Sequence, residues 1–232
     1  MPRESYQTQL DALREDVLYM SEIVLERLRM GLDALERKDE ELAWEVIDGD
    51  DEINELYLEL ERDCIDLLAL QQPVAGDLRF ITASFKIITD LERVADLATN
   101  LADYSLDAHQ DMYPEVDIQG IGDDVAGMVG DAMDAYAAED ADACVAIAAY
   151  DEEIDERCTA ASEVVVRDLI ETETGSAESG IDPEDGPDIE ALMDDVSRLL
   201  LTIRDLERVG DHAVNIAARA LYMVENDDEL IY

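Results

Sequence analysis

Residues 90–102 read Asp-Leu-Glu-Arg-Val-Ala-Asp-Leu-Ala-Thr-Asn-Leu-Ala, and they return 115 positions later, at residues 205–217, as Asp-Leu-Glu-Arg-Val-Gly-Asp-His-Ala-Val-Asn-Ile-Ala. Nine of the thirteen positions are identical. Self-similarity of this kind indicates a chain built from two copies of one structural unit. Upstream, residues 50–55 (Asp-Asp-Glu-Ile-Asn-Glu) match residues 151–156 (Asp-Glu-Glu-Ile-Asp-Glu) at an offset of 101. The offset grows by 14 residues between the two blocks, so one insertion in the second copy reconciles them.

Apolar residues at helical spacing predict three helices in each copy, and no alternating strand pattern is present. The expected helices lie near 5–37, 39–67 and 77–103 in the first copy, and near 122–138, 140–171 and 188–226 in the second. Pro73 and Gly76 interrupt the helical pattern between the second and third helices. Long helices joined by short turns are typical of antiparallel bundles. We therefore predict an all-α fold of six long helices in two tandem three-helix bundles.

The expected domain boundaries follow from the same pattern. The first bundle spans 1–107, a linker with Pro114 spans 108–121, and the second bundle spans 122–232. The insertion is the Gly-, Ser- and Pro-rich acidic loop 172–187, which stands where the first copy has only a short turn.

The charge balance is extreme, with 61 acidic residues against 16 basic ones and a formal net charge of -45. Such a charge destabilises a compact chain at low ionic strength, but at 1 M salt the Debye length is only about 3 Å. The periodic apolar pattern argues for a folded protein. We therefore expect it to work in the cytoplasm of a halophile with molar internal salt. Nucleic acid is excluded as a partner because no basic stripe is present to neutralise phosphates.

Other features of the composition favour the same compartment. The three cysteines are widely spaced, as expected for buried thiols in a reducing environment. No signal peptide and no stretch of 18 apolar residues is evident, so membrane association is expected only through a partner.

Acidic residues at positions i and i+4 repel each other on one helix face, and in this chain many such pairs occur by chance. The informative pairs are those that both copies keep in register: Glu92 with Asp96, Glu207 with Asp211, Asp50 with Asn54, and Asp151 with Asp155. Two antiparallel helices that each present such a pair can bring several oxygens to one point. Clusters of carboxylate oxygens suit Mg²⁺, Ca²⁺, Mn²⁺ or iron. Asn100 and Asn215, one turn further on, could add amide oxygens.

An alternative explanation competes with metal binding on equal terms. Arg93 and Arg208 are also repeated, so Glu92 and Glu207 could simply belong to a network of salt bridges. His212 is expected at the surface or at a helix end, because its counterpart in the first copy is a leucine. Trp44 is expected in the core or an interface, and His109 in the solvated linker.

The combination of motifs resembles the PhoU family of phosphate-uptake regulators. The resemblance rests on residues 72–79 (Gln-Pro-Val-Ala-Gly-Asp-Leu-Arg), on residues 86–96, which end in Asp-Leu-Glu-Arg-Val-Ala-Asp, and on the second copy of that motif at 205–217. It implies two symmetric three-helix bundles and metal clusters, often of iron or zinc, on the acidic motif. The family pattern expects an aspartate where this chain has Asn54, so the first cluster departs from it.

The resemblance also implies a regulatory adaptor and not an enzyme. Such a protein restrains phosphate import and the phosphate-starvation response through the ATPase and membrane subunits of a phosphate ABC transporter and, in bacteria, a sensor kinase. We also expect a homodimer. Two alternatives remain: a carboxylate-type metal storage or oxidase protein, and a purely structural helical repeat. The first normally uses Glu-x-x-His on a helix, and neither histidine has a glutamate three residues before it.

Overall fold

The computed structural model describes residues 2–71, 73–106, 116–179, 189–228 and 230–231. These residues form seven α-helices and no strand, which confirms the predicted all-α fold. The helices are α1 (Pro2–Arg37), α2 (Glu40–Asp48), α3 (Asp50–Gln71), α4 (Ala75–Leu106), α5 (Ile118–Ala138), α6 (Ala141–Ser179) and α7 (Ile189–Glu225).

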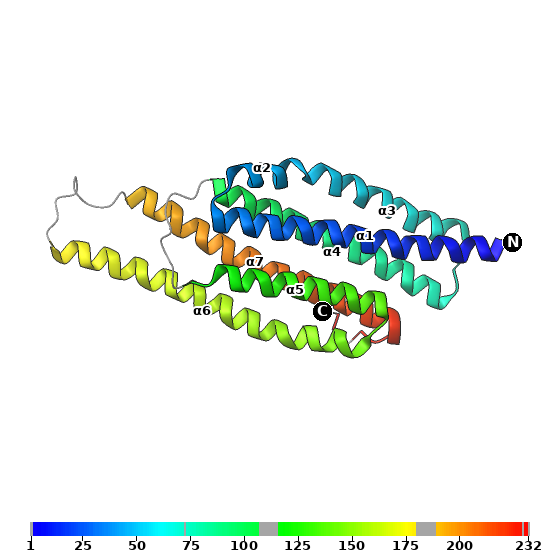
Figure 1. Cartoon of the computed structure of the whole chain (residues 1–232). Helices are drawn as coiled ribbons and strands as arrows, with labels where there is room; N and C mark the ends of the chain where they lie inside the picture. The colour runs from blue at the N-terminus through cyan, green and yellow to red at the C-terminus, as the bar shows by residue number, and fades with distance from the viewer. Residues whose placement is uncertain (1, 72, 107–115, 180–188, 229, 232) are drawn as a thin grey trace.

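The helices form two bundles that lie side by side with their long axes nearly parallel (Figure 1). In the first bundle α1 packs against α4 and the consecutive helices α2 and α3, and in the second bundle α5, α6 and α7 pack together. The bundles meet through contacts of α4 with α7 and of α1 with α5. Helices α3, α4, α7 and α6 therefore follow one another across the molecule as one layer, and α1 and α5 form a second layer.

Three boundaries differ from those predicted. The second predicted helix is divided at Gly49, where a Cβ atom would lie 2.7 Å from the guanidinium carbon of Arg27, so a larger residue would displace that side chain. Helix α5 begins at Ile118, inside the predicted linker. Helix α6 continues to Ser179, so the first half of the predicted loop 172–187 is helical. The rest of that loop, and His109, lie outside the described residues.

Both copies end their first helix and begin their second in the same way. Lys38 after α1 and Glu139 after α5 adopt left-handed backbone conformations, with φ of 52° and 56°. The aspartate that follows each of them accepts hydrogen bonds from backbone N–H groups of the next helix: Asp39 from Leu42 at 3.1 Å, and Asp140 from Ala143 at 3.1 Å. Side-chain caps of this kind satisfy N–H groups that have no partner within the helix.

A polar and aromatic group joins the two bundles in the core. The fully buried Tyr136 of α5 exchanges a 2.8 Å hydrogen bond with Ser84 of α4, and its ring stacks on Phe80 with 6.2 Å between ring centroids. The guanidinium of Arg14 lies over the Phe80 ring at 5.0 Å and also contacts Glu139 at 2.6 Å. Because Tyr136 comes from the second bundle and Ser84 from the first, their hydrogen bond fixes the register between the bundles.

Buried charges also lie where α4 crosses α7. Asp90 Oδ1 is 2.9 Å from Nδ1 of His212, and Asp205 Oδ2 accepts hydrogen bonds from Asn100 Nδ2 at 3.2 Å and Tyr104 OH at 2.9 Å. The placement of His212 at the surface was wrong, because its side chain is buried as the partner of Asp90. A carboxylate in the interface requires a polar partner, which explains why the second copy carries histidine where the first carries leucine.

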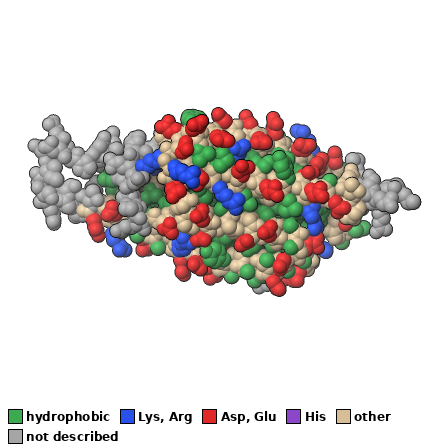
Figure 2. All heavy atoms as spheres, viewed as in Figure 1, with side chains coloured by type: hydrophobic (Ala, Val, Ile, Leu, Met, Phe, Trp, Pro, Cys, Tyr) green, Lys and Arg blue, Asp and Glu red, His purple; other side chains and the backbone are tan. Residues whose placement is uncertain are grey.

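The surface is strongly acidic, and Figure 2 shows carboxylates scattered over the whole visible face with few basic groups between them. The prediction that Trp44 lies in the core was wrong, since it is 53% exposed on the short helix α2, and its place in an interface stays a prediction. The described helices include none that is long and apolar enough to span a bilayer.

Candidate metal centre

Two acidic clusters occupy equivalent places in the two bundles. The second-repeat cluster consists of Asp151 and Asp155 on α6 with Glu207 and Asp211 on α7. These helices are neighbours, and the charges of Asp155, Asp211 and Glu207 all act on Asp151. The structure thus brings both predicted i, i+4 pairs of the second copy to one place.

Asp151 is the most constrained member of this cluster. Its Oδ1 atom is buried and has no hydrogen-bond partner among the described residues. Burial, and after it the negative charge of Asp155, raises the pKa of the Asp151 carboxyl to about 6. A buried oxygen without a donor is unfavourable in a protein interior, and a bound cation would satisfy it.

Glycine in α7 makes room for this carboxylate. A Cβ atom on Gly210 would lie 3.0 Å from Oδ1 of Asp151, so a larger residue would push the two helices apart or turn the carboxylate away. The first copy has Ala95 at the corresponding position. Sequence reasoning missed this residue, although the replacement of alanine by glycine within an otherwise matching motif was a visible signal.

The two carboxyls that α7 contributes to the second-repeat cluster also have raised pKa values. Burial and the nearby charge of Asp155 raise the pKa of both Glu207 and Asp211. Neighbouring carboxylates repel one another when they are ionised, and a bound divalent or trivalent cation offsets that repulsion. The electrostatics of the cluster therefore suit a metal ion.

The first-repeat cluster consists of Asp50 and Asn54 on α3 with Glu92 and Asp96 on α4. Burial, followed by neighbouring acidic charge, raises the pKa of Glu92 and of Asp96. The difference from the second repeat lies on α3, where Asn54 Nδ2 donates a 2.8 Å hydrogen bond to Asp50 Oδ2. Asn54 thus supplies internally the donor that Asp151 lacks.

The repeated arginines form ion pairs, but not with the glutamates that the salt-bridge alternative assigned to them. Arg93 lies 3.8 Å from Asp90, and Arg208 lies 3.4 Å from Asp205. Within the described parts of the chain, no carboxylate of either cluster forms an ion pair with a basic side chain. The repeated arginines therefore form their ion pairs with the buried aspartates of the α4–α7 interface, and they act on the pKa of Asp96 and Asp211 only through space.

The clusters are not closed metal sites as they stand. No three Asp, Glu, His or Cys side chains of the described residues are arranged to hold one ion. Asn100, one of the predicted amide ligands, instead donates its hydrogen bond to Asp205. Binding of an ion thus requires carboxylates at the cluster rim to turn inward, which exposed side chains such as Asp155 and Asp211 can do by changing rotamer.

Comparison with known proteins matches both repeats. The PhoU domain family model matches residues 17–105 and 118–220. The phosphate-specific transport system accessory protein PhoU homolog of Pseudomonas putida is 33% identical over 231 residues, covering 97% of this chain and 82% of the relative. The homolog of Caulobacter vibrioides is 33% identical over 222 residues, covering 92% of this chain and 87% of the relative.

Two solved structures share the fold. The crystal structure of PhoU from Pseudomonas aeruginosa superposes with a TM-score of 0.81 at 32% identity, covering 96% of this chain and all of that one. The phosphate transport system regulatory protein PhoU from Streptococcus pneumoniae superposes with a TM-score of 0.80 at 27% identity, covering 96% of this chain and 98% of that one. With the repeat, the two bundles and the acidic motif in place, the chain belongs to the PhoU family.

Proposed function

We propose that this protein is the regulatory accessory protein of a phosphate importer and that it acts by binding the importer and not by catalysis. The observation that carries this proposal is the family match over both repeats, together with relatives described as accessory proteins of the phosphate-specific transport system. The regulatory effect we propose is negative: the protein restrains phosphate uptake and phosphate-starvation signalling.

The partners we propose are the ATPase and membrane subunits of a phosphate ABC transporter, and a sensor kinase where the organism has one. The protein would reach the membrane only through these partners, from the cytoplasm. The test is an affinity capture at molar salt with purified ATPase and membrane subunits. Recovery of either subunit at a fixed stoichiometry supports the proposal, and recovery of neither would refute it.

We further propose that the second-repeat cluster binds a metal ion, with iron or zinc as the first candidates. The buried, unsatisfied oxygen of Asp151 supports this assignment, because the cluster has no internal donor for it in the described residues. The first-repeat cluster would bind more weakly, since the Asn54 amide already satisfies Asp50 and removes one charge. The two clusters would then differ in occupancy within one molecule.

The metal proposal is tested by elemental analysis and calorimetric titration with Zn²⁺, Mn²⁺ and Fe²⁺ at high salt. Asp151→Asn should lower the metal content and remove the tightest binding event. Glu92→Gln in the first cluster is the matched control and should leave that event unchanged. If wild-type protein that has never met a chelator carries no metal and binds none, the purely structural repeat is the correct alternative. In that case chelators would also leave the melting temperature unchanged.

The expected homodimer is a separate prediction. Sedimentation velocity at molar salt measures it directly, and a species with the mass of one chain would contradict it.

A further inference from the structure

Some of the exposed apolar residues of this protein are related in pairs by the repeat. Ile65 and Val166 correspond at the offset of 101, and they are 50% and 44% exposed. Leu78 and Met193 correspond at the offset of 115, and they are 43% and 45% exposed. None of the four is needed to fill the core, yet both copies retain a large apolar side chain at each position. Exposed apolar groups that gather in one place mark interaction sites.

In each bundle the two residues lie on the last two helices, one on each, and they share a face with the acidic cluster. On α4, intervals of three and four residues lead from Leu78 to Glu92 and Asp96, and on α7 the same intervals lead from Met193 to Glu207 and Asp211. Ile65 follows Asn54 on α3 by 11 residues, or three turns, and Val166 follows Asp155 on α6 by the same interval. Each helix pair thus carries one stripe that has an acidic part and, further along the same face, an apolar part. We call these the first and second docking stripes.

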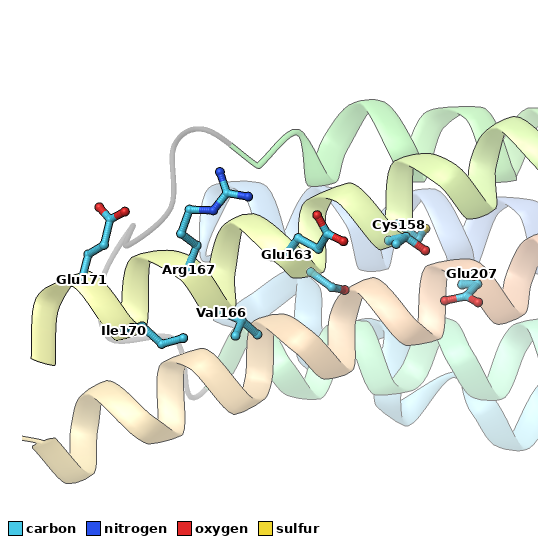
Figure 3. Close-up of a pocket in the computed structure, with 9 residues that line it drawn as sticks. Cys158, Glu163, Val166, Arg167, Ile170, Glu171 and Glu207 are labelled. Atoms are coloured by element: carbon cyan, nitrogen blue, oxygen red, sulfur yellow. The ribbon is translucent and has the colours of Figure 1, made fainter. Parts of the chain in front are cut away.

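The second docking stripe is hollowed into a groove of about 640 Å³. Its lining includes Val166, Ile170 and Glu207, so the apolar end and the acidic cluster are continuous. Figure 3 shows Val166 and Ile170 pointing from α6 toward α7, while Arg167 and Glu171, which also line the groove, project from the other side of α6. The groove therefore combines an apolar part at Val166 and Ile170 with charged side chains, among them Glu207 of the cluster.

The two stripes are related by the approximate two-fold axis of the molecule. Asp90 lies opposite His212 and Asp205 lies opposite Asn100, so residue numbers rise along α4 as they fall along α7. Equivalent helices that pack antiparallel are related by a two-fold axis between them. Since α3, α4, α7 and α6 form one layer, the axis places one docking stripe on each half of the same face of that layer.

We propose that this layer docks a two-fold symmetric protein whose two subunits each insert an amphipathic helix, apolar along one side and carrying Lys or Arg at one end, into a docking stripe. The apolar side covers Ile65 with Leu78, or Val166 with Met193, and the basic end meets the adjacent carboxylates. This inference deepens the proposed function and rests on it for the identity of the partner, because an ABC importer carries a pair of ATPase subunits.

Charge complementarity selects this occupant over a second copy of the same chain. Each docking stripe ends in carboxylates with no ion pair in the described residues, and the whole chain carries a net charge of -45. Two such layers pressed together would place carboxylate against carboxylate in an interface from which screening salt is excluded. A basic partner removes that repulsion.

The first test uses a synthetic amphipathic helix of roughly 18 residues, about 27 Å long, with leucines on one side and lysines toward one end. Calorimetry in about 2 M KCl, where screening suppresses nonspecific attraction, should give two peptides per chain. The double variant Ile65→Glu/Leu78→Glu should lower the stoichiometry to one, Val166→Glu/Met193→Glu should do the same, and the fourfold variant should bind at least about tenfold more weakly. Glutamate makes the surface more acidic, so purely electrostatic binding would become stronger. Unchanged or stronger binding by the fourfold variant would overturn the inference.

The second test uses the purified ATPase pair of the importer. Wild type should bind one chain per pair, and the fourfold variant should lose at least about tenfold in affinity. Tyr19→Glu is the matched control, because Tyr19 is 54% exposed on α1 in the other layer and its counterpart in the second copy is a glycine. If wild type fails to bind the ATPase pair, the proposed partner is wrong, and the peptide test still decides the docking stripes. If the fourfold variant binds the pair as wild type does while its melting curve is unchanged, the stripes are not the docking surface.

Discussion

Asp155→Asn would copy into the second repeat the arrangement that the first repeat already has. In the first repeat the amide of Asn54 donates to Asp50 at 2.8 Å, and Asp155 and Asp151 are the corresponding residues. The substitution removes one negative charge and offers a donor to the buried carboxylate of Asp151. We therefore expect it to stabilise the metal-free protein at neutral pH and to weaken metal binding.

The size of the effect follows from the pKa of Asp151. A rise from 3.8 to about 6 corresponds to roughly 3 kcal/mol of unfavourable free energy when this carboxylate is ionised. Burial is the larger cause and remains in the variant, and molar salt screens part of the contribution of Asp155. We expect a gain of about 1 to 2 kcal/mol in the free energy of unfolding. For a chain of this size that gain raises the melting temperature by roughly 3 to 6 °C.

The raised pKa of Asp151 also determines how the free energy of unfolding changes with pH. Because the folded-state pKa of Asp151 is raised, the folded protein binds more protons than the unfolded chain between about pH 4 and pH 6. The contribution of Asp151 to stability therefore falls as pH rises through that window and is most unfavourable above it. The gain in the free energy of unfolding from Asp155→Asn should be largest near pH 8 and small near pH 4.

The assay is thermal unfolding followed by circular dichroism in about 2 M KCl with a chelator, at both pH values. The reverse change in the first repeat, Asn54→Asp, is the control and should lower the melting temperature near pH 8. A melting temperature for Asp155→Asn at or below that of wild type near pH 8 would refute the reasoning, as would a gain that is equal near pH 4.

Three further predictions concern the rest of the fold. Gly31→Ala should lower the free energy of unfolding by about 1 to 3 kcal/mol, because its Cβ would lie 2.8 Å from the Ala98 carbonyl oxygen. Gly127→Ala, whose Cβ would meet open space, should raise that free energy by about 0.5 to 1 kcal/mol, and chemical denaturation measures both. His212→Leu leaves Asp90 with only a long contact to a neighbouring arginine, so unfolding should become easier by about 1 to 3 kcal/mol, and an unchanged denaturation midpoint would contradict this role. Lowering KCl from about 2 M to about 0.1 M should lower the melting temperature of wild type, and a melting temperature that is independent of salt would show that repulsion within the net charge of -45 does not limit stability.

The repeated motif and the apolar period predicted the fold class and the two bundles, because both follow from which residues face a core. The division of the second helix at Gly49 was not predicted, because the apolar spacing continues across it from Val46 to Ile53. The burial of His212 was not predictable either, since the local sequence does not reveal that Asp90, 122 residues away, lies opposite it.

The sequence predicted which acidic residues lie together, but it did not predict the difference between the two clusters. Metal binding by these residues stays a prediction. Register between the repeats singled out the cluster residues from a background of 61 acids. The donor that Asn54 provides and the absence of one for Asp151 are matters of side-chain geometry across a helix turn. The space that Gly210 leaves depends on how closely α6 and α7 approach, which no single-chain pattern encodes.

The order of the helices along the chain has a consequence for synthesis. Helix α7 follows α4, α5 and α6 in the chain and packs against all three, and it carries the partners of the buried polar groups on α4. A nascent chain that ends before α7 therefore exposes one face of each of three helices and leaves Asp90 without its histidine. Translation that stops before α7 therefore yields a product with exposed apolar surface, which chaperones and proteases recognise.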